Sequence, residues 1–197
     1  MAILDAAGNV LERLGLAMKM DDVAAEADVS KGTLYLYFSS KDALLAGFAE
    51  RNLASLLPRL RTRANDAATG LDAVAGIIEE NIEFFQAHPT SFRLMVGWLQ
   101  QPEVDDSSDD FQAYRARLQE VHGTFLGAFE RGKADHSIRA DVDTVHHAMQ
   151  VWASTVGVVL MHQNTVSLMK RITIPIDFSQ LVPVHLDAIR RLLAVHP

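Results

Sequence analysis

The sequence predicts an all-α protein, in which a three-helix N-terminal domain containing a helix-turn-helix precedes a larger helical domain. Three observations support this fold class. Apolar residues recur at helical spacing in nearly every segment, and no segment alternates convincingly as a strand. The stretch from Asp28 to Ser39 also reads DVSKGTLYLYFS, as expected for a tight turn followed by a short helix. We expect about nine helices and a domain boundary between residues 47 and 48.

Residues that begin or end helices mark the first three expected elements. A helix over residues 3–14 should end at Gly15, because glycine readily adopts the left-handed conformation that follows a helix. A short helix over residues 22–27 should lead into a turn at Asp28, where aspartate adopts that conformation at modest cost. Ser30 can then cap the third helix through its hydroxyl oxygen.

The fourth expected helix is long and contains a proline. It should begin near Lys41, with Ser39 or Ser40 as its cap, and continue past Leu57. We expect Pro58 to lie within this helix or to kink it.

Five further helices are expected, and polar or proline-containing breaks separate them. Loops are expected at residues 65–70, 103–110, 134–141 and 164–177. The expected helices are Leu71–His88, Thr90–Gln101, Phe111–Lys133, Val142–Asn164 and Phe178–Val195.

Composition narrows the class of protein. Apolar residues make up 49% of the 197 residues, enough for a sizeable core, and cysteine is absent, which fits a reducing compartment. No run of about 18 uncharged apolar residues predicts a membrane span. Met1 leads directly into a helical pattern, without the basic region and following apolar region that are typical of a signal peptide. We therefore expect a cytoplasmic protein that makes no membrane contact.

The charge is acidic overall but not uniformly so. The net charge of −7 argues against binding of polyanions by the whole surface. Residues 1–50 contain four basic and eight acidic side chains, yet Val29 to Lys41 contains two lysines and no acid. The segment that a helix-turn-helix places in a DNA major groove is thus the least acidic part of its domain.

The third helix carries side chains suited to DNA. Lys31 can donate to guanine or phosphate, and Gly32 lets the backbone come close. The hydroxyl of Thr33 can reach phosphate, and its methyl group can touch thymine. Tyr35 and Tyr37 offer hydroxyl groups to bases or phosphates. The sequence therefore predicts binding to double-stranded DNA.

Two flanking features complete this prediction. Leu34 and Phe38 are spaced four residues apart and should face the core instead of the DNA. Lys41 combines a positive charge with a helix N-terminus, which suits a phosphate.

This segment resembles the TetR family of tetracycline-repressor-like bacterial regulators. The resemblance covers about a quarter of the chain, Ile3 to Leu45, in the segments ILDAA and VAAEADVSKGTLYLYFSSKDALL. It implies a two-fold dimer that binds a palindromic operator, and a C-terminal domain that binds a small molecule. Most members of the family are repressors that such a molecule releases from DNA.

The chain departs from the family pattern beside the motif. Met20 stands where the family usually has a phosphate-binding threonine or serine, and Asp21 and Asp22 add negative charge close to the expected DNA backbone. Lys19 can replace part of the lost phosphate contact. The expected DNA-binding residues are Lys19, Ser30, Lys31, Gly32, Thr33, Tyr35, Tyr37 and Lys41.

Aromatic and sulfur-containing side chains gather in the central segments. They could enclose an apolar pocket between helices, although plain core packing is the favoured explanation for any one of them. The resemblance favours a pocket for a small hydrophobic effector. The candidate effector-binding residues are Phe84, Phe85, His88, Phe92, Met95, Trp98, Tyr114, His122, Phe125, Met149 and Trp152.

The last two long helices suit a dimer interface. Ala153 and Gly157 are one turn apart and would permit close approach of a second helix. An ordinary helix pair within one chain is the alternative. The expected dimer residues are Ala153, Val156, Gly157, Leu160, Leu186, Ile189 and Leu193.

Two other functions compete with a ligand-responsive regulator. A small-molecule sequestering protein with a vestigial DNA domain would explain the acidic Asp21 and Asp22. An enzyme is disfavoured, because no nucleophile elbow, phosphate loop or cysteine is present. Acid pairs such as Glu79 and Glu80 are expected to be solvated. The histidine spacings match no metal motif, so we expect no metal site and no cofactor.

Overall fold

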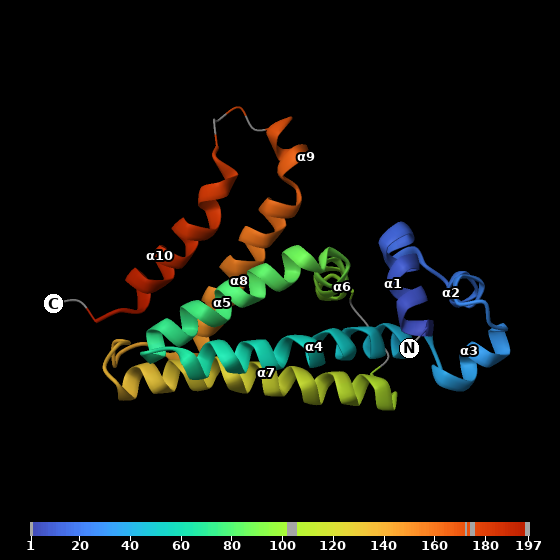
Figure 1. Cartoon of the computed structure of the whole chain (residues 1–197), viewed down its shortest axis with the longest axis horizontal. Coiled ribbons are helices and arrows are strands. Elements are labelled where there is room, and N and C mark those ends of the chain that lie inside the picture. The colour runs from blue at the N-terminus through green and yellow to red at the C-terminus, as the bar shows by residue number, and fades with distance from the viewer. Residues whose placement is uncertain (1, 102–105, 172, 174–175, 196–197) are drawn as a thin grey trace. The chain divides into compact units, whose positions relative to one another are not determined.

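The computed structural model describes residues 2–101, 106–171, 173 and 176–195 (Figure 1). These residues form ten α-helices and two short 3₁₀-helices, and their only β-type pairing is one isolated bridge between Ile138 and Ala194. The all-α fold class is therefore confirmed. None of the helices in the described ranges has the length and apolar character needed to cross a membrane.

The expected helices are present. Their ends lie within two residues of the predicted positions, except that the last helix begins at Leu181 instead of Phe178, because Phe178–Gln180 forms a 3₁₀-helix. The α-helices are α1 (Ala2–Leu14), α2 (Met20–Glu26), α3 (Lys31–Tyr37), α4 (Lys41–Asp66), α5 (Gly70–Ala87), α6 (Pro89–Leu99), α7 (Asp109–Ala134), α8 (Thr144–Gln163), α9 (Thr165–Met169) and α10 (Leu181–Leu193). The 3₁₀-helices are η1 (Gly15–Ala17) and η2 (Phe178–Gln180).

Helix α9 was not expected. The prediction that the chain is irregular after Asn164 was wrong for Thr165–Met169. The side-chain amide of Asn164 donates to the Leu160 carbonyl, and the Leu168 N–H donates to the Asn164 carbonyl. Asn164 therefore ends α8 and starts a new helical turn. The expected loops also include residues 102–105, 172, 174 and 175, which lie outside the described residues.

Local signals set most of the helix ends. Gly15 follows α1 with a φ of +58°, as expected for a residue that stops a helix. Ser40 caps α4, because its Oγ accepts from the Ala43 N–H at 3.0 Å. Pro58 lies inside α4, and the helix continues past it to Asp66.

The chain divides into two compact units. The first contains Met1–Ser55 and His88–Glu120, and the second contains Leu56–Ala87 and Val121–Pro197. The expected domain boundary at residues 47 and 48 falls within the continuous helix α4, and it remains a prediction.

The core of the first unit forms between α1, α2, α3, α4 and α6. Leu94 of α6 is part of this core, and Trp98 packs against it. Gly97 lets α6 approach η1, because a Cβ there would lie 2.5 Å from Leu16 Cδ1. The other buried members of the core are Ala6, Ala7, Val10, Leu11, Met18, Met20, Val23, Ala24, Leu34, Leu44, Leu45 and Phe48.

In the second unit, α5 packs against α8 and α10. Arg131 of α7 binds the C-terminal end of α4, since its guanidinium donates to the carbonyl of Ala64 in the last turn at 2.8 Å and to that of Ala67 just after the helix at 2.6 Å. The start of α5 lies directly on α7: a Cβ on Gly70 would be 2.0 Å from the Gly132 backbone nitrogen. A Cβ on Gly132 would in turn be 2.5 Å from Ile138 Cδ1, so neither Gly70 nor Gly132 leaves room for a side chain.

Candidate DNA-binding surface and effector-binding residues

A short turn sets the direction of α3 after α2. Asp28 adopts the left-handed conformation, with a φ of +52°, as the sequence predicts. The Val29 N–H returns to the Ala24 carbonyl at 3.0 Å. Ser30 then caps α3, and its Oγ accepts from the Thr33 N–H at 3.0 Å. The helix-turn-helix geometry is therefore built by contacts within ten residues.

One side chain anchors α3 to the core and leaves the rest of the helix exposed. Leu34 is fully buried, and Phe38 packs partly against the same cluster, as expected. The outward positions are Lys31, Gly32, Tyr35, Leu36 and Tyr37. Lys31 lies one turn before Tyr35, and Gly32 lies one turn before Leu36.

Among the large hydrophobic side chains of α3, Leu36 is the most exposed, and it is not one of the DNA-binding residues expected from the sequence. Its exposed fraction is 86%, against 67% for Tyr37 and 44% for Tyr35. Leu36 could have been found from the helical register, because it lies one turn after Gly32 and two residues after the buried Leu34. The exposed face of α3 is therefore more apolar than the sequence analysis assumed.

The acidic pair at the start of α2 has two different roles. Asp22 accepts from the Lys19 N–H at 2.8 Å and so caps α2. Asp21 forms an ion pair with Lys31, in which Oδ1 and Nζ are 2.6 Å apart and both side chains are exposed. The hydrogen bond that Lys31 donates to Asp21, together with the negative charge of Asp21, raises the pKa of Lys31. Met20 is buried in the core.

The remaining expected DNA-binding residues also make internal contacts. Thr33 is half-buried, and its hydroxyl lies 2.8 Å from the hydroxyl of Ser30. Lys41 Nζ donates to the Leu16 carbonyl at 3.0 Å, which ties η1 to the start of α4. Lys19 is exposed beside α2. All eight residues lie in the first unit, between η1 and the first turn of α4.

The candidate effector-binding residues are divided between the two units. In the first unit, Trp98 and Tyr114 are brought together with Phe111, with ring centroids 5.3–6.0 Å apart. Burial raises the pKa of Tyr114. Trp98 Nε1 is buried and has no hydrogen-bond partner among the described residues. His88 is exposed at the start of α6, Phe92 is buried and Met95 is half-buried.

The candidates in the second unit are less concentrated. Phe84 packs edge-on against Phe85 at 5.6 Å, and Phe125 packs edge-on against Phe129 at 5.3 Å. These pairs account for Phe84, Phe85 and Phe125 as ring contacts within the unit. The three other candidates differ in exposure: Trp152 is half-buried, whereas Met149 and His122 are exposed. Partial desolvation lowers the pKa of His122.

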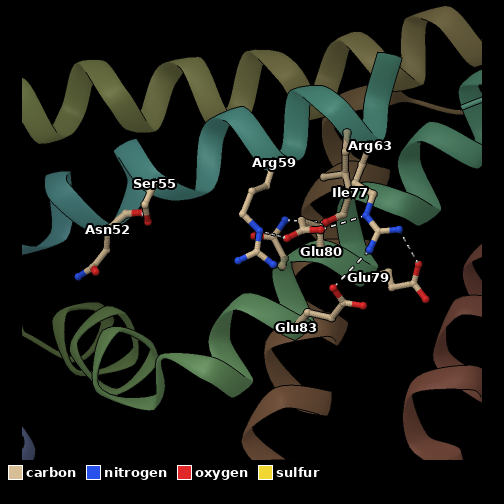
Figure 2. Close-up of polar contacts among 9 residues, drawn as sticks. Asn52, Ser55, Arg59, Arg63, Ile77, Glu79, Glu80 and Glu83 are labelled. Carbon is tan, nitrogen blue, oxygen red and sulfur yellow. Dashed lines mark hydrogen bonds and ion pairs between the residues drawn. The ribbon is translucent and has the colours of Figure 1, made fainter. Parts of the chain in front are cut away.

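A buried carboxylate joins α4 to α5 (Figure 2). Glu80 of α5 is only 4% exposed, and the expectation that it is solvated was wrong. Arg59 and Arg63, one turn apart on α4, both pair with it, and Arg63 Nε lies 3.0 Å from Oε2. Arg63 also reaches Glu79 and Glu83, at 3.7 and 3.3 Å. The hydrogen bond with Glu80 raises the pKa of Arg63.

The expected dimer residues fall into two groups. Ala153 and Leu160 of α8 are exposed, and a Cβ at Gly157 would meet nothing within 4 Å, so this face is open. Val156 is half-buried. In contrast, the three expected residues of α10 lie in the core of the single chain; these are Leu186, Ile189 and Leu193.

Two family models match the chain. Residues 3–47 match the family described as bacterial regulatory proteins, tetR family. Residues 74–172, which make up half of the chain, match the family described as the tetracyclin repressor-like C-terminal domain. Each compact unit therefore contains residues that match a model of tetracycline-repressor-like proteins.

Individual relatives agree with these matches. YvdT of Bacillus subtilis, an uncharacterised HTH-type transcriptional regulator, is 36% identical over 127 residues, which cover 60% of this chain and 62% of that protein. RutR of Escherichia coli, an HTH-type transcriptional regulator, is 28% identical over 158 residues, covering 78% and 70%. The chain thus spans less than two thirds of the length of YvdT.

Solved structures show the same fold. The transcriptional regulator FadR from Bacillus subtilis, in complex with stearoyl-CoA, superposes with a TM-score of 0.74 over 100% of this chain and 99% of that one. The two sequences are 20% identical, so this likeness concerns the fold alone.

Proposed function

Because the chain belongs to the TetR family of bacterial regulatory proteins, we propose that it is a DNA-binding transcriptional regulator that acts as a homodimer on a palindromic operator. The observation that carries this proposal is the outward face of α3, which is held by Leu34 and by the Ser30 cap while Lys31, Tyr35 and Leu36 remain exposed. A helix presented in this way fits the major groove.

Phosphate contacts would come from the flanks of α3. Lys31, Lys19, Tyr37 and the first turn of α4 with Lys41 provide positive charge or donors around it. In the DNA complex, phosphate would take the place of Asp21 as the partner of Lys31. An acidic chain can bind DNA through such a local surface, because charges act within about 8–10 Å at physiological salt.

We further propose that a small hydrophobic effector releases the protein from its operator, which makes the protein a repressor. The aromatic cluster of Trp98, Phe111 and Tyr114 in the first unit supplies apolar contacts. The Trp98 indole N–H, which has no partner among the described residues, supplies one donor. The effector would favour a conformation in which the two α3 helices no longer match successive grooves. A useful switch needs a coupling of about 1–3 kcal/mol.

The DNA proposal is tested by selecting duplexes from a randomised library and measuring their affinity at several salt concentrations. Lys31→Ala should weaken binding to all sequences and lower the salt slope by about one for each subunit. Lys170→Ala removes an exposed lysine after α9 and serves as the control. The same assay with added lipophilic compounds measures release.

Failure to find salt-sensitive, sequence-selective binding would favour the alternative of a small-molecule sequestering protein. The ion pair between Asp21 and Lys31 is the observation that supports this alternative, because it neutralises one lysine of the surface in the free protein.

A further inference from the structure

We propose that Leu36 reads the 5-methyl group of a thymine in each half of the operator. This inference rests on the proposed function, and it names the base that α3 recognises. Its starting point is the 86% exposure of a leucine on a seven-residue helix whose other exposed residues are Lys31, Gly32, Tyr35 and Tyr37. No contact within the described chain accounts for a leucine at this position.

The chemistry of leucine limits what Leu36 can recognise. Its side chain neither donates nor accepts hydrogen bonds, so phosphate oxygens and the polar base edges offer it no favourable contact. The thymine 5-methyl is the apolar group on the base edges of the major groove. A leucine inserted in that groove is therefore selective for thymine over cytosine, which lacks the methyl group.

The position of Gly32 supports this assignment. Side chains of an α-helix lean toward its N-terminus, so Leu36 leans over the turn that contains Gly32. A Cβ at Gly32 would approach only its neighbour Ser30 Oγ, at 3.7 Å, and is open on the other sides. The surface beside Leu36 is thus bare backbone, and a base can come close to both residues.

The polar groups around Leu36 do not compete for this role. Lys31 is paired with Asp21 in the free protein and is suited to phosphate, and Thr33 shares its hydroxyl with Ser30. Tyr35 and Tyr37 are also exposed, but each carries a hydroxyl group that can bond to a base or a phosphate. Leu36 is therefore the exposed aliphatic side chain of α3, and it can distinguish bases only by apolar contact.

The test combines a change in the protein with a change in the DNA. Duplexes enriched by the wild-type chain are remade with deoxyuridine at each thymine in turn, which removes only the 5-methyl group. At one thymine of each half-site, the wild-type affinity should fall about fourfold, the value for one buried methyl-sized group. Leu36→Ala should bind the thymine duplex more weakly and lose this sensitivity to deoxyuridine.

Controls separate a local contact from a general effect. Leu99→Ala removes another exposed leucine, from α6, where its exposed fraction is 63%, and should leave both affinities unchanged. Leu36→Gln should move the base preference at the same position away from thymine and toward adenine, because glutamine pairs with adenine N6 and N7. Circular dichroism verifies that each variant is folded.

Each outcome decides one question. Equal sensitivity of the wild type and Leu36→Ala to every deoxyuridine would overturn the assignment of Leu36 while DNA binding stands. If no thymine of the enriched half-sites is sensitive to removal of its methyl group, the assignment of Leu36 is likewise overturned while DNA binding stands. If the library yields no enriched duplex, the proposed function itself fails, and the assignment of Leu36 fails with it.

Discussion

Asp21 gives the proposed DNA-binding surface an internal competitor. It lies 2.6 Å from Lys31, so the lysine that is best placed to meet the DNA already has an anionic partner. Exposed ion pairs of this kind contribute little to stability, because water screens both charges. Their effect on binding is larger, since Asp21 stays close to the phosphates when Lys31 turns to them. Asp21 should therefore weaken DNA binding while stability hardly depends on it.

Asp21→Asn should raise the affinity for DNA. Removing one negative charge near the phosphates should increase the affinity about threefold for each subunit at low salt, and less at high salt. Fluorescence anisotropy with a selected duplex measures this gain. Glu12→Gln, which removes an exposed acid from α1, serves as the charge-matched control. Equal gains in the two variants would show an effect of net charge and contradict a specific role for Asp21.

Helix α4 depends on both its cap and its partners. Ser40 fixes its start, while the buried Leu56, Leu57 and Leu60 surround Pro58 and hold the helix in place where a backbone hydrogen bond is missing. Beyond the proline, Arg59 and Arg63 pair with Glu80 of α5. The two guanidiniums offset the negative charge of a carboxylate that burial would otherwise make costly. We therefore expect the second half of α4 to follow α5 in any movement.

Glu80→Gln should destabilise this pair of helices. The substitution keeps the shape of the side chain but leaves two guanidiniums without their shared carboxylate. Because both arginines are partly exposed, we expect a loss of about 1–3 kcal/mol, less than for a fully buried pair. Glu83→Gln removes an exposed member of the same network and should cost about 0–0.5 kcal/mol. Urea unfolding at equal protein concentrations measures the difference, and equal losses in the two variants would contradict it.

At the scale of the whole molecule, the open face of α8 is the surface proposed for the partner subunit. Ala153, Gly157 and Leu160 follow one another along this face, and Val145 and Met149 extend it with exposed fractions of 61% each. Together they offer apolar area and a place for close helix approach. A two-fold dimer formed here would need to present its two α3 helices about 34–36 Å apart to meet successive grooves.

Leu160→Glu should therefore yield a monomer that binds DNA poorly. The side chain is 43% exposed in the single chain, so the charge harms the dimer more than the fold. Analytical ultracentrifugation should give the mass of two chains for the wild type and of one chain for the variant. Leu99→Glu places the same charge on α6 as a control. A variant that remains dimeric would exclude this face of α8 as the interface.

The local parts of this structure follow from residues close together in the chain. The left-handed turns at Gly15 and Asp28, the Ser30 cap and the burial of Leu34 each depend on contacts or preferences within a few positions, and all were predictable. Helix periodicity likewise predicted the fold class. These signals are strong because backbone conformation and helix capping act over a single turn.

Other features required residues that are distant in sequence to meet. Glu80 is paired with Arg63, which lies seventeen residues earlier in the sequence, on α4. The acidic pair Glu79 and Glu80, considered along the sequence alone, indicated solvated side chains. Helical periodicity marks Leu193 as apolar, but it does not distinguish a residue packed in its own chain from one that meets a partner. The pairing of Asp21 with Lys31 likewise depends on the angle between α2 and α3. Burial and pairing depend on how the helices pack, and a pattern along one helix does not contain that information.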